Sequence, residues 1–258
     1  MTGLQDTILA AFQGPVLIAG LVFLRVGAVM ALLPAFGERA VPARIRLALA
    51  FAFTAIVAPA VEAHIGPPTG DAAGYVLFLL AECANGLALG LVIRLFLLAL
   101  EMAGGIAAQS GSLSQMFGVQ GEPMPAMAHL LVMSALCLAA LSGLHVRAAG
   151  AMILSYEALP AGTVPGAGLL KDWTVGQMSQ AFALAFSLAA PFVVAALLYN
   201  VALGVINRAM PSLMVAFVGA PALTAGALIM LAVAAPLMLG LWKGAFDAIL
   251  ADPFAVPR

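Results

Sequence analysis

Charged residues are scarce in this sequence: only 8% of its 258 residues are Asp, Glu, Lys or Arg. Soluble domains carry about 25% charged residues, and they need them to cover the surface that faces water. Apolar residues make up 64% of the chain. The shortage of charge therefore excludes an ordinary soluble protein and predicts an integral membrane protein.

An excess of basic residues is also missing, since the formal net charge is −1. Nucleic-acid-binding proteins carry a basic footprint, so the sequence predicts no nucleic-acid partner. The two cysteines, Cys83 and Cys137, lie in apolar runs without CxxC spacing. We expect them to be small buried apolar side chains rather than redox groups or metal ligands.

No catalytic or cofactor-binding motif is present. His64, His129 and His145 are far apart and belong to no HExxH pattern, and there is no GxSxG elbow or phosphate-binding GK[ST]. The sequence thus predicts a protein that is not an enzyme and that binds neither a metal nor a cofactor.

What the chain has in abundance is long apolar runs. A membrane span needs about 20 mostly apolar residues to cross about 30 Å of hydrocarbon, and six runs reach or approach that length. We predict an all-α membrane protein in which the longer runs tilt, bend or project beyond the bilayer. The runs are 15–36, 45–61, 72–100, 127–159, 178–206 and 212–242.

The ionisable residues Arg25, Glu82 and Arg94 lie inside these runs. Each would cost several kcal/mol if it faced lipid, so each is expected to face protein or a wet cavity. They could line an ion or proton path, or they could form a structural pair or a contact with a partner subunit, which we favour. Arg94 could also reach the interface from a long helix.

The connection 37–46 is the most basic segment of the chain and holds Arg39, Arg44 and Arg46. The positive-inside rule places it in the cytoplasm, together with Arg208 in a later short turn. Two GxxxG patterns, Gly86 to Gly90 and Gly240 to Gly244, predict close helix packing.

The stretch Glu101 to Met127 differs from the runs around it. It mixes five glycines and three serines with apolar side chains, and Pro123 and Pro125 end it. Long connections in compact proteins are usually functional or disordered, and this one is too apolar for solvated disorder. We predict a mobile internal loop that is surrounded by protein.

Three blocks of sequence carry a resemblance to a known family. They are Arg25 followed by PAFGERAVPARIRLALA (34–50), AGGIAAQSG (103–111), and NVALGVINRAMPSLMVAFVGAP (200–221). Together, and in this order, they resemble the flagellar biosynthesis protein FliR and its virulence-secretion counterparts, which are subunits of the type III export gate. Residues 112–122 match no family pattern.

The resemblance implies an architecture. Residues 1–177 would be a FliP-like helical part that includes a central plug loop at about 104–126, and residues 178–258 a FliQ-like helical hairpin with a short tail. One such chain would complete a ring of five FliP-like and four FliQ-like subunits, beside an FlhB-like subunit. The expected location is the bacterial inner membrane, in contact with lipid, at the flagellar basal body.

The resemblance also gives the central loop a role, as a plug that closes the pore until an unfolded export substrate arrives. A glycine-rich backbone with a few apolar side chains can pack and unpack reversibly, whereas tightly packed elements resist deformation. The expected plug residues are Gly105, Gln109, Gly111, Leu113, Met116, Phe117 and Met124.

Two alternatives stay open: a virulence export gate, or a stand-alone secondary transporter that uses the charged residues of its spans for coupling. A transporter would often show internal repeats, and none is evident. The basic connection can set topology, which we favour, or dock a neighbouring subunit. The candidate subunit contacts or buried charges are Arg25, Glu82, Arg94, Arg44, Arg46 and Arg208.

Overall fold

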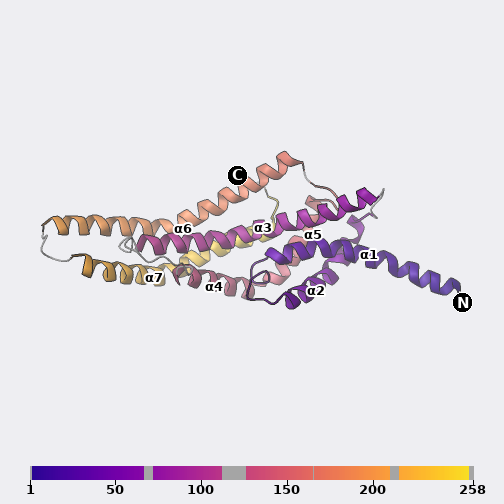
Figure 1. The fold of residues 1–258 in the computed structure, drawn as a ribbon, viewed down its shortest axis with the longest axis horizontal. Helices are drawn as coiled ribbons and strands as arrows, with labels where there is room; N and C mark the ends of the chain where they lie inside the picture. Colours follow the sequence, from indigo (N-terminus) through magenta and orange to yellow (C-terminus); the bar gives the residue numbers. More distant parts are fainter. Residues whose placement is uncertain (1, 67–71, 112–125, 165, 210–214, 256–258) are drawn as a thin grey trace. The chain divides into compact units, whose positions relative to one another are not determined.

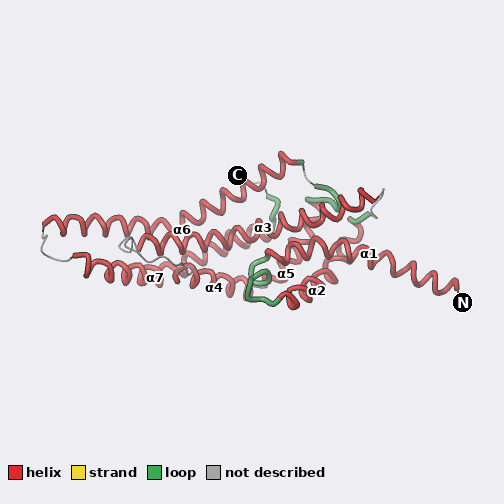
Figure 2. Tube along the Cα trace, in the orientation of Figure 1, coloured by secondary structure: helices red, strands yellow, loops and turns green. Residues whose placement is uncertain are grey.

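The chain folds into α-helices. The computed structural model describes residues 2–66, 72–111, 126–164, 166–209 and 215–255. Within these ranges there is no strand (Figure 2), which confirms the predicted all-α class. The helices, shown in Figure 1, are α1 (Thr2–Leu32), α2 (Ala43–Val61), α3 (Ala72–Gly111), α4 (Ala126–Leu141), α5 (Leu144–Ala158), α6 (Ala167–Ala209) and α7 (Val215–Ala251), with a 3₁₀ turn at Glu62–His64.

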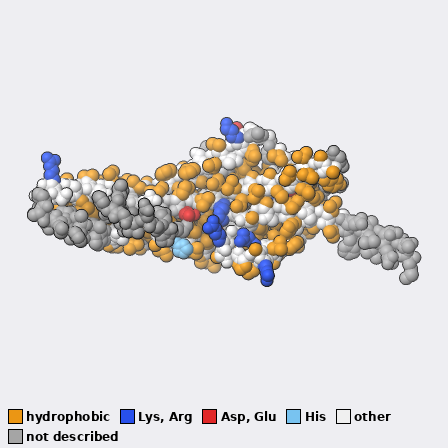
Figure 3. Space-filling model, viewed as in Figure 1, with side chains coloured by type: hydrophobic (Ala, Val, Ile, Leu, Met, Phe, Trp, Pro, Cys, Tyr) orange, Lys and Arg blue, Asp and Glu red, His pale blue; other side chains and the backbone are white. Residues whose placement is uncertain are grey.

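Within the described residues, five helices contain segments long and apolar enough to cross a membrane by themselves. The consecutive helices α4 and α5 would supply a sixth span if they count as one bent pair. Apolar side chains also dominate the surface, as Figure 3 shows for one face; Leu141 is 80% exposed and Val233 76%. A water-soluble monomer rarely exposes apolar area on this scale, so the predicted integral membrane protein is confirmed.

The chain divides into two compact units. Unit 1 comprises residues 1–94, 140–177 and 247–258, and unit 2 comprises residues 95–139 and 178–246. The predicted division into a FliP-like and a FliQ-like part concerns resemblance to other proteins rather than compactness, so it stays a prediction.

In unit 1, α1 and α2 form an antiparallel hairpin (Figure 1). The rings of Phe23 and Phe51 stack with their centroids 4.7 Å apart, and α2 also packs on α5. The buried side of α1 carries Val22, Val26 and Val29. These residues recur every three or four positions, which is the spacing that brings side chains to one helical face.

In unit 2, the end of α3, α4, and most of α6 and α7 pack through small residues. Ala99, Ala181 and Ala185 form a buried cluster. Trp242 in α7 is fully buried, its Nε1 donates a hydrogen bond to the Phe96 carbonyl oxygen (2.8 Å), and its ring stacks on Phe246. This one large side chain ties α7 to α3.

The prediction of a loop from Glu101 was wrong for its first part, because α3 continues to Gly111. Gly104 explains the difference. A Cβ atom on Gly104 would lie 2.4 Å from the Cα of Ala128, so this glycine lets α3 and α4 approach closely instead of loosening the chain.

The run 127–159 was expected to be a single long segment that tilts, bends or projects, and it bends. The helices α4 and α5 are separate, and Gly143 between them has φ +80°. That left-handed conformation suits glycine, and it ends one helix and starts the next. The predicted bend is confirmed.

Two smaller expectations were wrong. Helix α6 starts at Ala167 rather than near residue 178, because its first turns pack on the C-terminal segment: Trp173 Nε1 donates to the Pro253 carbonyl oxygen (3.0 Å). Cys137 is exposed, whereas Cys83 is partly buried. An apolar residue on a membrane helix can face lipid, so an apolar run does not imply burial inside the protein.

Candidate functional site

Two of the charged residues of the spans, Arg25 and Glu82, meet inside unit 1. Arg25 of α1 is fully buried, and Glu82 of α3 is 1% exposed. The guanidinium binds the carboxylate through two hydrogen bonds, from Nε to Oε2 (2.9 Å) and from Nη2 to Oε1 (2.9 Å). This parallel, two-point arrangement is the strongest geometry available to an arginine–carboxylate pair. The structure thus answers a question that the sequence left open: Arg25 and Glu82 pair.

A second layer of groups from α5 and the loop after it completes the pair. Arg25 Nη1 donates to the carbonyl oxygens of Ser155 (3.1 Å) and Leu159 (2.9 Å), and the guanidinium carbon lies 3.8 Å from the centre of the Tyr156 ring. The Tyr156 hydroxyl donates to Glu82 Oε2 (3.2 Å), and the Gly162 amide donates to Oε1 (2.9 Å).

These contacts satisfy both charges from α1, α3 and α5. A buried pair is tolerated only if its remaining hydrogen-bonding groups are also satisfied, and here they are. A proton path or a coupling site needs a group that can change partners. The saturated geometry favours the structural interpretation of Arg25 and Glu82 over the coupling one.

Glycine allows α1 and α3 to approach closely enough for this pair. A Cβ on Gly86 would lie 2.3 Å from the carbonyl oxygen of Arg25, and one on Gly90 would lie 3.1 Å from that of Val29. The first GxxxG pattern is therefore a packing surface, as predicted, and its partner helix is α1. A Cβ on Gly240 or Gly244 would meet nothing within 4 Å, so among the described residues the second pattern packs against no partner.

The remaining basic candidates lie nearer the surface. Arg94 Nη1 is 3.3 Å from Glu38 Oε1 and 3.4 Å from the Leu32 carbonyl oxygen, so it holds the connection between α1 and α2. Arg44 is exposed, and Arg46 is partly buried. Arg208 is exposed in the last turn of α6, where a positive charge complements the helix dipole.

The expected plug residues fall into two groups. Gly105, Gln109 and Gly111 belong to α3. The other four, Leu113, Met116, Phe117 and Met124, lie outside the described residues.

A groove of about 480 Å³ in unit 2 runs along α3 beside α4 and α6. Gly105 and Gln109 line it, together with Glu101, Met102 and Phe182. Two of the expected plug residues therefore border an apolar hollow.

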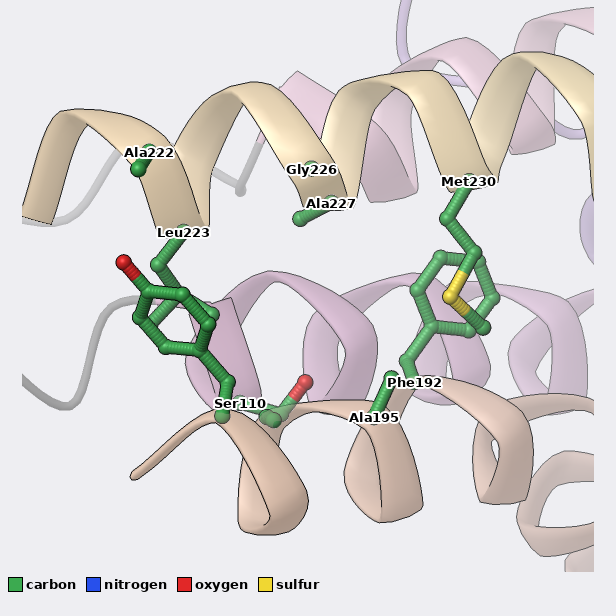
Figure 4. A pocket seen from close by; sticks show the side chains of 10 residues that line it. Ser110, Phe192, Ala195, Ala222, Leu223, Gly226, Ala227 and Met230 are labelled. Carbon is green, nitrogen blue, oxygen red and sulfur yellow. The ribbon is translucent and has the colours of Figure 1, made fainter. Parts of the chain in front are cut away.

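A second hollow, of about 270 Å³, lies between the end of α3 and the α6–α7 pair (Figure 4). Ser110 borders it on α3, Phe192 and Tyr199 on α6, and Leu223 and Met230 on α7. Two hollows lined mainly by apolar side chains thus lie around the end of α3 in unit 2.

The sequence reasoning missed Ser155, Tyr156, Gly162 and Trp242. Ser155 and Tyr156 stand out as hydrogen-bonding side chains in an apolar run, and that is the feature by which they could have been found. Gly162 contributes its backbone amide. Every residue except proline has such a donor, so the residue type does not reveal this role. Within the described part of the chain, no cluster of three His, Cys, Asp or Glu side chains could hold a metal ion.

Comparison with known proteins gives a consistent result. Residues 16–249 match the family model described as bacterial export proteins, family 1. The chain is 37% identical over 219 residues to the flagellar biosynthetic protein FliR of Caulobacter vibrioides, covering 82% of this chain and 84% of that one. It is 30% identical over 220 residues to the proteins of the same name from Escherichia coli K12 (81% of each chain) and Bacillus subtilis 168 (83% and 84%).

Proposed function

Because the chain belongs to the family of bacterial export proteins, family 1, we propose that it is a structural subunit of the protein-conducting gate for flagellar type III export. The observation that carries the proposal is the family match, which covers residues 16–249. The chain is a membrane-embedded component of an export apparatus and not an enzyme. The flagellar rather than the virulence system is favoured because the three relatives are named as flagellar proteins.

In the proposed gate this chain joins five FliP-like and four FliQ-like subunits, next to an FlhB-like subunit, in the bacterial inner membrane. Residues 178–258 supply the FliQ-like hairpin, made of α6 and α7. The exposed apolar side chains of these helices support that role: Phe186 is 61% exposed, Leu197 62% and Val233 76%. Such faces require either lipid or partner helices to cover them.

We place the plug at about 104–126, with Leu113, Met116, Phe117 and Met124 as its sealing side chains. Helix α3 ends and helix α4 begins in unit 2, and Gly105, Gln109 and Ser110 near the end of α3 border the two hollows. Apolar hollows there offer surfaces on which apolar side chains of a seal could pack and from which they could separate. Gly105, Gln109 and Gly111 act as the helical base of the plug.

The test is a comparison of two chromosomal variants. One lacks residues 112–121, and the other replaces them with glycine and serine at the same length, which keeps the connection and removes its apolar side chains. Both are expected to co-purify with the FliP-like and FliQ-like subunits in wild-type ratio and to make the inner membrane leak small ions. The leak is measured as the loss of membrane potential.

Membranes that stay ion-tight in both variants, with the complex intact, would refute the plug. A wild-type chain that purifies without other export subunits would refute the gate itself. Loss of the gene should abolish flagellar filaments and motility, and motile cells would exclude the flagellar assignment.

A further inference from the structure

A groove of about 260 Å³ lies between α1 and α2 in unit 1. Phe23, Gly27 and Met30 line it from α1, and Arg46 and Ala50 line it from α2. All of these except Arg46 are apolar. Because the helices are antiparallel and Phe23 stacks on Phe51, Phe23 and Ala50 mark the inner end and Met30 and Arg46 mark the end near the connection.

Arg46 is the polar group of this groove, and its hydrogen bonds are incomplete. Its Nη2 donates to the Val41 carbonyl oxygen (3.1 Å), while its Nε is buried and has no partner among the described residues. Arg39 and Arg44, from the same basic segment, are exposed. None of the ion pairs found in the described part of the chain includes these three arginines.

The start of α2 adds a second attraction for an anion at the same end. The residue before the helix, Pro42, provides no side-chain cap, and the first turn has no acidic residue. The first backbone amides of a helix carry partial positive charge and bind phosphate readily. Ala43, in that first turn, also lines the groove.

The groove has a defined depth relative to a bilayer. The candidate spans are Gly14–Leu32 in α1 and Ala43–His64 in α2, so the end with Arg46 lies where both spans end, at the level of lipid headgroups. From Ala43 to Ala50 the helix rises about 10 Å, which leads into the acyl region. A basic end at the interface and an apolar end below it match the two parts of a phospholipid.

We propose that this groove is a binding site for one anionic phospholipid. Its phosphate lies against Arg46 and the start of α2, and one acyl chain runs along α1 past Gly27 toward Phe23. Basic pockets between membrane helices on the cytoplasmic side are suited to such headgroups, and the positive-inside rule puts this end in the cytoplasm. Free phosphate or an acidic peptide has no chain to fill the apolar part.

Two matched pairs of variants separate the headgroup from the acyl chain. Arg46→Gln removes the charge in the groove, and Lys171→Gln removes an exposed charge elsewhere in unit 1. Gly27→Leu fills the groove, and Gly20→Leu adds the same side chain to α1 outside it. A Cβ on either glycine meets nothing within 4 Å, so both leucines fit on the helix.

The measurement is lipid retention by the full-length protein in native mass spectrometry, after purification from nanodiscs with equal amounts of phosphatidylglycerol and phosphatidylethanolamine. Wild type is expected to retain one phosphatidylglycerol. Arg46→Gln should weaken this about fivefold, the effect of one basic residue at the membrane surface. Gly27→Leu should weaken it about tenfold, because it displaces about two methylene groups of the acyl chain. Lys171→Gln and Gly20→Leu should match wild type.

Equal retention of the two lipids by wild type overturns the proposal, and so does full retention by Gly27→Leu. If Gly27→Leu keeps the lipid but loses another export subunit from the purified complex, the groove is a protein interface and the proposal is wrong. Melting temperatures identify a variant that has failed to fold; Gly27→Ala, with a smaller side chain, then provides an intermediate test.

Discussion

The two units of this protein are held together in different ways. Among the described residues, every buried Arg, Glu, Asn, Gln, Ser or Thr side chain belongs to unit 1. There, two-point hydrogen bonds join Arg25 and Glu82, and groups from α5 surround them. Unit 2 is joined instead by a buried alanine cluster, the close approach of α3 and α4 at Gly104, and the buried side chain of Trp242.

The difference has a physical consequence. Hydrogen-bonded charge pairs in a low-dielectric interior tolerate only one arrangement, because any displacement leaves a buried charge unsatisfied. Contacts between alanine and glycine surfaces are weak individually and can re-form after a shift. Unit 1 therefore has the character of a fixed frame, and unit 2 that of a region that can change its packing, where the proposed plug begins.

The largest effect on stability should follow from Glu82→Gln, which removes the carboxylate of the buried ion pair in unit 1. The substitution leaves the Arg25 charge buried without a counter-charge, and loss of one partner of a buried pair costs about 3–5 kcal/mol. The free energy of unfolding, measured in mixed detergent and denaturant micelles, should fall by that amount. The control is Glu157→Gln, which removes an exposed carboxylate from α5 and should change little.

An intermediate effect is expected from two neighbouring glycines of unit 2. Gly104→Ala places a Cβ 2.4 Å from the Cα of Ala128, whereas Gly105→Ala meets nothing within 4 Å. Overpacking should cost Gly104→Ala about 1–3 kcal/mol, while Gly105→Ala should gain up to about 1 kcal/mol of helix propensity. Equal melting temperatures for the two variants would contradict the close contact.

The smallest effect concerns the one hydrogen bond that we describe between α7 and α3. Trp242→Phe removes the Nε1 donor to Phe96 and leaves a carbonyl group that α-helical bonding already satisfies in part. The lost hydrogen bond should cost about 1 kcal/mol, and the smaller ring adds the cost of the cavity that it leaves. If unfolding of this variant costs as much as Glu82→Gln, unit 2 depends on directional bonds after all and the contrast between the units fails.

The composition and the lengths of the apolar runs were sufficient to predict an all-α integral membrane protein. Membrane helices must satisfy their own backbone, so an apolar run of sufficient length specifies its structure locally. The packing role of Gly86 and Gly90 was also predictable, because a GxxxG motif places no side chain between two helices and so lets them approach closely. Their partner helix was not, because it depends on how α1 and α3 come together.

Two features could not be predicted from the sequence. They are the helical structure of Glu101 to Gly111 and the pairing of Arg25 with Glu82. Glycine in a row of small residues fits a loop and a tightly packed helix equally well, and only Ala128, which lies beyond the predicted loop, decides between them. Arg25 and Glu82 were recognised as needing partners. Their pairing also depends on Ser155, Tyr156 and the Gly162 amide, and the sequence does not show that these groups come together with Arg25 and Glu82.

The separation of Arg25 and Glu82 by 57 residues along the chain matters during biogenesis. At translation rates of about 5–20 residues per second, the ribosome makes the arginine about 3 to 11 s before its carboxylate. Throughout that interval the first span has no permanent counterion. Nascent α1 therefore has to wait in a hydrated or protein-lined compartment, such as an insertase, until α3 arrives.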